Sequence, residues 1–285
     1  MNKYKYSVQI ISSKNPVKIY KQLIICPFKG YISWQHYKVV DSFDKILSLI
    51  KNSHFKALDL TALIDEEIDE ILEIANPNLE YLTLNYCSFN NESIEKCKNL
   101  IIFCGNNLRS LTSLWNVKKN KALERLSLFN CKYLKDISNI KNSKLTTLEI
   151  SVNAYEINNS NNIEDYSVFK SMKQLENLTL FVKDNIDKVK DLKDLSKLTN
   201  IKYLSLPKNF FTFNQFAWLK SKLLEEKNIS ALYNIRKDIS NERIYADIIG
   251  SDKPDHVYKD EADLEAYQNE FIKLIEQYKN VKQPF

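Results

Sequence analysis

The chain has little glycine or proline: its 285 residues include 3 Gly and 6 Pro. This scarcity excludes a collagen-like or linker-rich organisation. No apolar run approaches the roughly 18 residues of a membrane-spanning helix. Residues 1–18 also lack the uninterrupted apolar core of a signal peptide. We therefore expect neither secretion nor membrane anchoring by ordinary routes, and we expect a cytoplasmic location.

Cysteine is sparse as well, and no CxxC pair is present. The five cysteines are Cys26, Cys87, Cys97, Cys104 and Cys131. An odd number without paired spacing argues against a disulfide framework and against a zinc site. A reducing compartment is the simplest setting for such a chain.

Catalytic and metal-binding patterns are also missing. The three histidines, His36, His54 and His256, lie far apart, and no HExxH, GxSxG, P-loop or GxGxxG occurs. The acidic run 65–70 could hold a metal or a carboxylate pair, but it has no EF-hand spacing, and a solvated helix face explains it. We expect no enzyme, no cofactor and no metal.

The charge balance is weak for a nucleic-acid binder. The chain has 41 basic and 36 acidic residues, a net charge of +5, and its lysines are scattered. We therefore expect no nucleic-acid partner.

Seven short segments with the pattern apolar-x-x-apolar-x-apolar/small dominate the middle of the chain. Their starts are separated by 24, 21, 23, 22, 30 and 26 residues: Phe55, Leu79, Leu100, Leu123, Leu145, Leu175 and Ile201. The units from Leu100 and Leu123 superpose at seven apolar or small offsets, which fixes the register. A period of this length indicates stacked repeats, each unable to bury its apolar face alone.

The segments LEYLTLNYC (79–87) and LERLSLFNC (123–131) match LxxLxLxxC, and LTTLEISVN (145–153) is close to it. These units resemble leucine-rich repeats of the short, internalin-like bacterial class. The resemblance covers residues 55–211. It implies an α/β solenoid with a parallel β-sheet on the concave face, 3₁₀ or helical returns on the convex face, and a cap at each end.

The pattern divides the chain into three parts. Residues 1–54 form an N-terminal cap with strands at 4–11 and 19–25 and a helix from Phe43. Residues 55–212 hold about seven irregular repeats, with an insertion at 154–162 and a helix-like return at 186–198. Residues 213–285 form a C-terminal cap, with an aromatic cluster at 210–219, a further strand at 229–235 and an amphipathic helix at 260–278.

Strand alternation separates buried columns from outward rows. Cys87 and Cys131 turn inward as inert thiols, whereas Cys104 faces outward and could be accessible. Aromatic and Arg side chains on an otherwise polar sheet suit a protein interface. The candidate partner-binding residues on the concave face are Tyr81, Thr83, Asn85, Ile102, Arg125, Ser127, Phe129, Glu149, Asn177, Phe181 and Tyr203. The alternative is that the insertion or the C-terminal tail covers this face.

We predict a monomeric, non-catalytic protein–protein interaction module, with an inhibitor or immunity-type protein as one concrete version. The Lys-, Asn- and Ile-rich composition hints at a bacterial source. Two alternatives stay open. One is an enzyme or effector with its activity in residues 213–285, and the other is a surface adhesin of internalin type, which the missing signal peptide disfavours.

Overall fold

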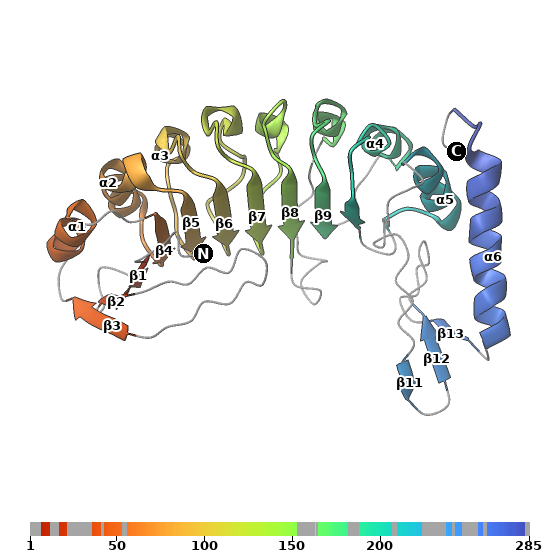
Figure 1. Ribbon diagram of the computed structural model, residues 1–285, viewed down its shortest axis with the longest axis horizontal. Helices are drawn as coiled ribbons and strands as arrows, with labels where there is room; N and C mark the ends of the chain where they lie inside the picture. Colours follow the sequence, from red (N-terminus) through yellow and green to blue (C-terminus); the bar gives the residue numbers. More distant parts are fainter. Residues whose placement is uncertain are drawn as a thin grey trace.

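The protein is built around one long parallel sheet (Figure 1). The computed structural model describes residues 7–11, 17–21, 36–40, 43–52, 56–152, 163, 165–181, 188–206, 210–223, 238–240, 243–246, 256–258 and 261–282. The sheet has eight strands in the order β1-β4-β5-β6-β7-β8-β9-β10. Their bounds are β1 Ser7–Ile11, β4 Ala57–Thr61, β5 Tyr81–Asn85, β6 Ile102–Asn106, β7 Arg125–Phe129, β8 Thr147–Ser151, β9 Asn177–Phe181 and β10 Tyr203–Ser205.

A return leads from each strand to the next, and the returns lie along one side of the sheet in Figure 1. They contain short helices or 3₁₀ turns: α2 Asp65–Ala75 with η1 Asn76–Asn78, α3 Asn91–Lys96, η2 Val117–Lys119, η3 Ser138–Ile140, η5 Ser167–Ser171 and α4 Lys188–Leu195. The predicted leucine-rich-repeat solenoid is therefore confirmed. The helix-like return before β10 is present as α4, and the insertion at 154–162 lies outside the described residues.

The apolar columns of the repeats fill the interior. Leu58, Leu82, Phe103, Leu126, Leu148, Leu178 and Leu204 occupy equivalent positions and are buried. Gly105 stands in the second inward column, where Leu60, Leu84 and Leu128 occupy the equivalent positions. The packing around Gly105 explains the missing side chain. A Cβ at Gly105 would lie 2.5 Å from Leu108 Cδ1 and 2.9 Å from Leu128 Cδ2, so larger neighbours fill the space of the missing side chain.

The two inward cysteines behave as predicted. Cys87 Sγ lies 3.5 Å from the carbonyl oxygen of Leu60 and 3.3 Å from that of Asn85. Cys131 Sγ lies 3.7 Å from the oxygen of Gly105 and 3.6 Å from that of Phe129. Both thiols are buried, and burial raises the pKa of each, in the case of Cys131 to about 11. They are core residues, and at neutral pH they stay protonated.

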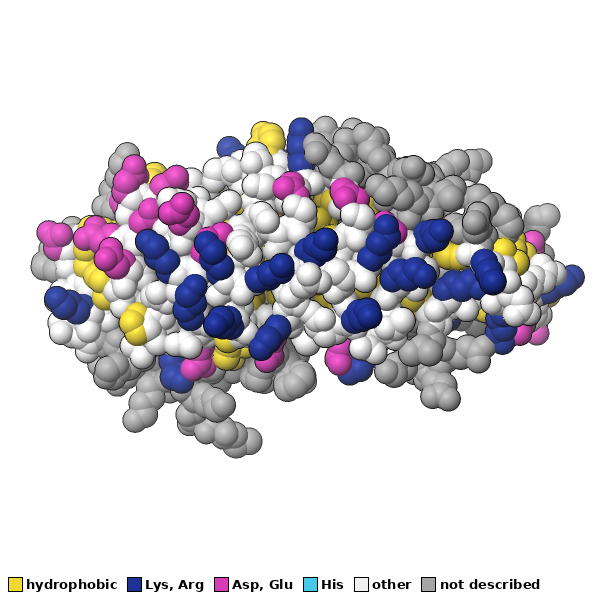
Figure 2. Space-filling view, turned by 90° about the horizontal axis from the view of Figure 1, so that it is seen from above, with side chains coloured by type: hydrophobic (Ala, Val, Ile, Leu, Met, Phe, Trp, Pro, Cys, Tyr) yellow, Lys and Arg dark blue, Asp and Glu magenta, His cyan; other side chains and the backbone are white. Residues whose placement is uncertain are grey.

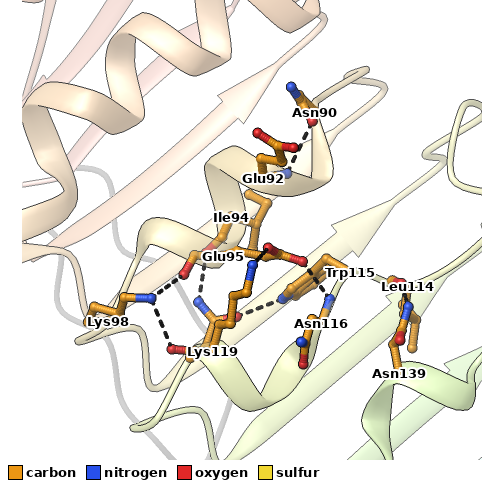
Figure 3. A network of polar contacts seen from close by, with 11 residues as sticks. Asn90, Glu92, Ile94, Glu95, Lys98, Leu114, Trp115, Asn116, Lys119 and Asn139 are labelled. Carbon is orange, nitrogen blue, oxygen red and sulfur yellow. Dashed lines mark hydrogen bonds and ion pairs between the residues drawn. The ribbon is translucent and has the colours of Figure 1, made fainter.

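A buried amide also joins two successive turns of the solenoid, and two of its partners, Ile94 and Trp115, are labelled in Figure 3. Asn120 is 2% exposed, and its Nδ2 donates to the carbonyl oxygens of Ile94 at 2.7 Å and Cys97 at 2.8 Å. Its Oδ1 accepts from Trp115 Nε1 at 2.7 Å. These three hydrogen bonds satisfy polar groups that would otherwise be buried without partners. Sequence analysis did not identify it.

The N-terminal segment does more than end the sheet. Although residues 7–11 lack the repeat motif, β1 pairs with β4 in parallel, with Ser7 opposite Ala57, and so adds one strand to the edge. Strands β2 (Val17–Lys21) and β3 (His36–Val40) form an antiparallel pair, and α1 (Phe43–Lys51) follows. Strand β3 was not predicted.

The C-terminal segment begins with α5 (Phe213–Lys222), which a Thr212–Gln215 capping box starts. The predicted aromatic cluster is core: Phe210, Phe211, Phe216 and Trp218 are buried. The predicted amphipathic helix is α6 (Glu261–Tyr278). Three short strands, β11 (Asp238–Ser240), β12 (Arg243–Ala246) and β13 (His256–Tyr258), form an antiparallel sheet that was not predicted. The predicted strand at 229–235 lies outside the described residues.

Helix α6 stands beside α5 at the end of the solenoid in Figure 1. Trp218 Nε1 donates to the carbonyl oxygen of Val281 at 2.9 Å. The ring centroids of Phe213 and Phe271 are 5.1 Å apart, and Phe271 is 4% exposed. Helix α6 and the residues just after it therefore pack on α5, where they cover the end of the core.

Candidate protein-interaction surface

The strand pairing places the predicted outward residues in three continuous rows. We call these rows the outer face. The first is Ala57, Tyr81, Ile102, Arg125, Thr147, Asn177 and Tyr203; the second is Asp59, Thr83, Cys104, Ser127, Glu149, Thr179 and Ser205; the third is Thr61, Asn85, Asn106, Phe129, Ser151 and Phe181. All eleven predicted site residues lie in these rows, and their role in binding stays a prediction.

Apolar side chains of the outer face differ in their exposure to solvent. Phe129 is 44% exposed and Tyr203 is 41% exposed, whereas Tyr81, Ile102 and Phe181 are half-buried. Phe129 and Phe181 stand two strands apart with Ser151 between them. Two large rings on either side of a small residue are suited to contact with an apolar side chain of a partner.

At the centre of the outer face, Arg125, Ser127 and Glu149 form a closed triangle. Arg125 Nη2 lies 3.0 Å from Glu149 Oε1 and 2.9 Å from Oε2. Arg125 Nε donates to Ser127 Oγ at 3.1 Å, and Ser127 Oγ donates to Glu149 Oε2 at 2.5 Å. Because the Arg125 and Glu149 side chains are 42% and 34% exposed, the pair adds little to stability. Its main effect is to hold Arg125 in one position against Ser127 and Glu149.

A second polar chain crosses the N-terminal half of the outer face. Asn85 Nδ2 donates to Asp59 Oδ1 at 2.6 Å, and Asn106 Nδ2 donates to Asn85 Oδ1 at 2.6 Å. Farther along, Asn177 Nδ2 donates to Thr147 Oγ1 at 3.2 Å. These cross-strand bonds fix side chains that would otherwise rotate freely. Binding of a partner would therefore cost little side-chain conformational entropy on this face.

The residue after each of four successive strands has a left-handed backbone. Ala62, Tyr86, Asn107 and Asn130 have φ between 54° and 58°, and each of their amides continues the ladder to the next strand. Asn130 Nδ2 also donates to Asn107 Oδ1 at 2.6 Å. Tyr86 is 62% exposed at this edge of the outer face, and sequence analysis missed it. Asn107 and Asn130 occupy the equivalent position after β6 and β7, and Asn tolerates a left-handed backbone, so the sequence carried a signal for a turn here.

The described residues show no arrangement suited to catalysis. They include no group of three His, Cys, Asp or Glu that could hold a metal ion. Cys104 faces the second row as predicted but is only partly accessible, and burial raises its pKa. Burial raises the pKa of Cys97 to about 12. None of these thiols is activated as a nucleophile. His54 and the side chains of His36 and His256 lie outside the described part.

The acidic run opens α2, as expected for a solvated helix face. Asp65, Glu66 and Glu70 are exposed, and the first two line a polar pocket of about 450 Å³ with Phe89 and Ser110. Carboxylates in the first turn of a helix favour its dipole. No helix among the described residues is long and apolar enough to cross a membrane.

No protein-family model and no curated protein matches the chain. Among solved structures, an internalin from Listeria monocytogenes is similar with a TM-score of 0.37 and 18% identity, covering 58% of this chain and 50% of that one. A leucine-rich-repeat protein from Leptospira interrogans is similar with a TM-score of 0.34 and 16% identity, covering 65% and 56%. The chain thus spans about half the length of each. The fold assignment rests on the chain's own strand register and buried columns.

Proposed function

We propose that this protein is a non-catalytic interaction module whose outer face binds one protein partner. The observation that carries the proposal is the exposure of Phe129 and Tyr203 on a sheet face that is rich in Thr, Ser and Asn and has a neutralised Arg–Glu pair at its centre. Aromatic anchors surrounded by fixed polar groups are typical of the centre of a protein interface.

The size of the outer face supports a protein partner. Seven strands spaced about 4.8 Å apart give a face about 30 Å long. A small molecule would need a deep apolar pocket, whereas the pocket described above is polar and lies at the start of α2. We propose that a single copy of the chain presents this face, since nothing in the repeats calls for a second copy.

The proposal extends to setting and role. Cys87, Cys97, Cys104 and Cys131 are free thiols, which suits a reducing compartment such as a bacterial cytoplasm. A rigid face that covers another protein's active site is one way such a module acts, as an inhibitor or immunity-type protein would. This role goes beyond the fold, because one repeat architecture serves many partners.

The test is recovery of a partner by crosslinking from the native host, followed by binding measurements with both proteins purified. The variants Tyr81→Ala, Arg125→Ala, Phe129→Ala and Phe181→Ala are expected to weaken binding, with Phe129→Ala losing about 2 kcal/mol or more. Their melting temperatures should stay close to that of the wild type. The matched control is Tyr133→Ala, since Tyr133 is 55% exposed but lies outside the outer face.

Two outcomes would count against the proposal. Unchanged affinity in all four variants would remove the outer face as the binding site. Equal weakening by Tyr133→Ala would show that exposed aromatics bind without regard to position.

A further inference from the structure

The surface formed by the returns has an uneven distribution of charge. Figure 2 shows it from above, with acidic side chains gathered at the end near α1 and α2 and basic side chains along the middle. The sequence explains the polarity. Residues 57–95 contain ten carboxylates and no Lys or Arg, whereas basic residues dominate the later returns.

Seven exposed lysines lie in the later parts of the three returns that precede β7, β8 and β9. We call them the lysine band: Lys118, Lys119, Lys121, Lys141, Lys144, Lys170 and Lys173, all exposed. Lys119 Nζ pairs with Glu95 Oε2 at 2.5 Å, and Lys170 Nζ pairs with Asp194 Oδ1 at 2.9 Å. The other five make no ion pair with another described residue. Neighbouring cations without counter-charges repel one another and attract an anionic ligand.

The band is narrow because carboxylates border it within each turn. Asp136 and Asp165 precede the lysines of the band in their turns, and the Oδ1 of each accepts from the backbone N–H two residues later. Glu124 and Glu176 follow the lysines, just before the next strand. Figure 2 accordingly shows acidic side chains toward both long edges of the basic region. A broad anionic surface such as a bilayer would meet these carboxylates as well as the lysines.

The chemistry of the band argues against nucleic acid. Residues 117–122, 138–144 and 167–174 contain no arginine, and their one aromatic residue, Phe169, is fully buried. Arginine binds a phosphate through two parallel hydrogen bonds, and exposed aromatic side chains stack on bases. Lysine provides only a point charge. A narrow row of point charges fits an extended chain of carboxylates.

We propose that the lysine band is a second interaction surface, which binds an extended acidic segment of a protein. Three returns at a strand spacing of about 4.8 Å accommodate about four extended residues. The acidic end at α2 repels such a segment, so the charge polarity also sets where along the solenoid it binds. This surface lies on the returns, apart from the outer face, and does not depend on the proposed function of that face.

The test uses the full chain and a fluorescein-labelled peptide of alternating Asp and Glu, with anisotropy measured at low and high salt. Binding at low salt that weakens as salt rises is expected. Lys121→Glu/Lys141→Glu/Lys144→Glu should weaken binding by about tenfold or more. The control Lys51→Glu/Lys273→Glu/Lys282→Glu changes the net charge equally at exposed sites outside the band and should change affinity by less than about threefold.

Several results would overturn the proposal: no peptide binding at low salt, equal weakening by the two triple variants, or tighter binding of single-stranded oligothymidine or phosphatidylserine vesicles than of the peptide. If the Glu variant fails to fold, the Gln variant at the same three lysines replaces it, with the same expected direction. Phe129→Ala should bind the peptide normally, which separates this surface from the outer face.

Discussion

At the scale of single residues, Asn120 has the largest expected effect on stability. Replacing it with Ala leaves the carbonyls of Ile94 and Cys97 and the indole N–H of Trp115 without their partner inside the core. We expect Asn120→Ala to lower the free energy of unfolding by about 3 kcal/mol, measured by urea denaturation. Asn139→Ala is the matched control, because the exposed Asn139 bonds the carbonyl of Leu114 at 2.7 Å and should cost about 1 kcal/mol or less. Equal losses of unfolding free energy in the two variants would contradict a stabilising role for the buried bonds of Asn120.

The buried thiols make stability fall at high pH. Burial raises the pKa of Cys97 from 9.0 to about 12, whereas the thiol of the unfolded chain titrates near its ordinary value. Between these two values the unfolded state has lost the proton and the folded state keeps it, so stability declines as pH rises above about 9. For one thiol the slope is about 1.4 kcal/mol per pH unit. Cys97→Ala should therefore have a shallower decline than the wild type in unfolding experiments between these pH values; parallel curves would contradict the prediction.

At the scale of elements, Phe271 is the one buried apolar side chain among the described side chains of α6. Phe271 packs against Phe213 and is 4% exposed, while its neighbour Ile272 is 57% exposed. Phe271→Ala should lower the free energy of unfolding by about 3 kcal/mol because it removes the apolar anchor of the helix. Ile272→Ala should change it by less than about 0.5 kcal/mol. A fluorescence shift of Trp218 reports whether α6 has detached, and the absence of both effects would exclude this docking.

The elements that sequence analysis found are those with a periodic local signal. Matching the units at Leu100 and Leu123 assigned the outward rows. The pairing of Arg125 with Thr147, and of Thr147 with Asn177, confirms that register. Elements without such a signal, β3 and β11–β13, were missed. A strand at 4–11 was predicted, but the pairing of β1 with β4 joins residues 50 positions apart, and no local pattern indicates it.

The same limit applies to the candidate site. The register placed Arg125 on the outer face, but its contact with Glu149 depends on side-chain direction across two strands, and Asn120 binds carbonyls 23 and 26 residues earlier. Such contacts are tertiary, and no spacing within one repeat encodes them. Tyr86 was missed because its left-handed backbone turns it to the edge of the sheet.

At the scale of the whole molecule, each repeat is stabilised by its neighbours, so the ends are the sensitive points. Deletion of 213–285 uncovers the buried rings Phe210 and Phe211 at the last turn. We expect the truncated chain to aggregate or to lose its cooperative melting transition, as measured by circular dichroism and gel filtration. The rival hypothesis of an enzyme or effector domain in 213–285 expects a folded solenoid with an unchanged melting temperature that lacks an activity.

The place of β1 in the sheet has a consequence for biosynthesis. Ser7 pairs with Ala57, 50 residues later, whereas each later strand pairs with one that precedes it by 21 to 30 residues. At a translation rate of about 5–20 residues per second, β1 leaves the ribosome several seconds before its partner is made. The strands from β5 to β10 can dock one by one in the order of synthesis. The nascent chain must therefore keep its first strand unpaired, in a window when chaperones would have access to it.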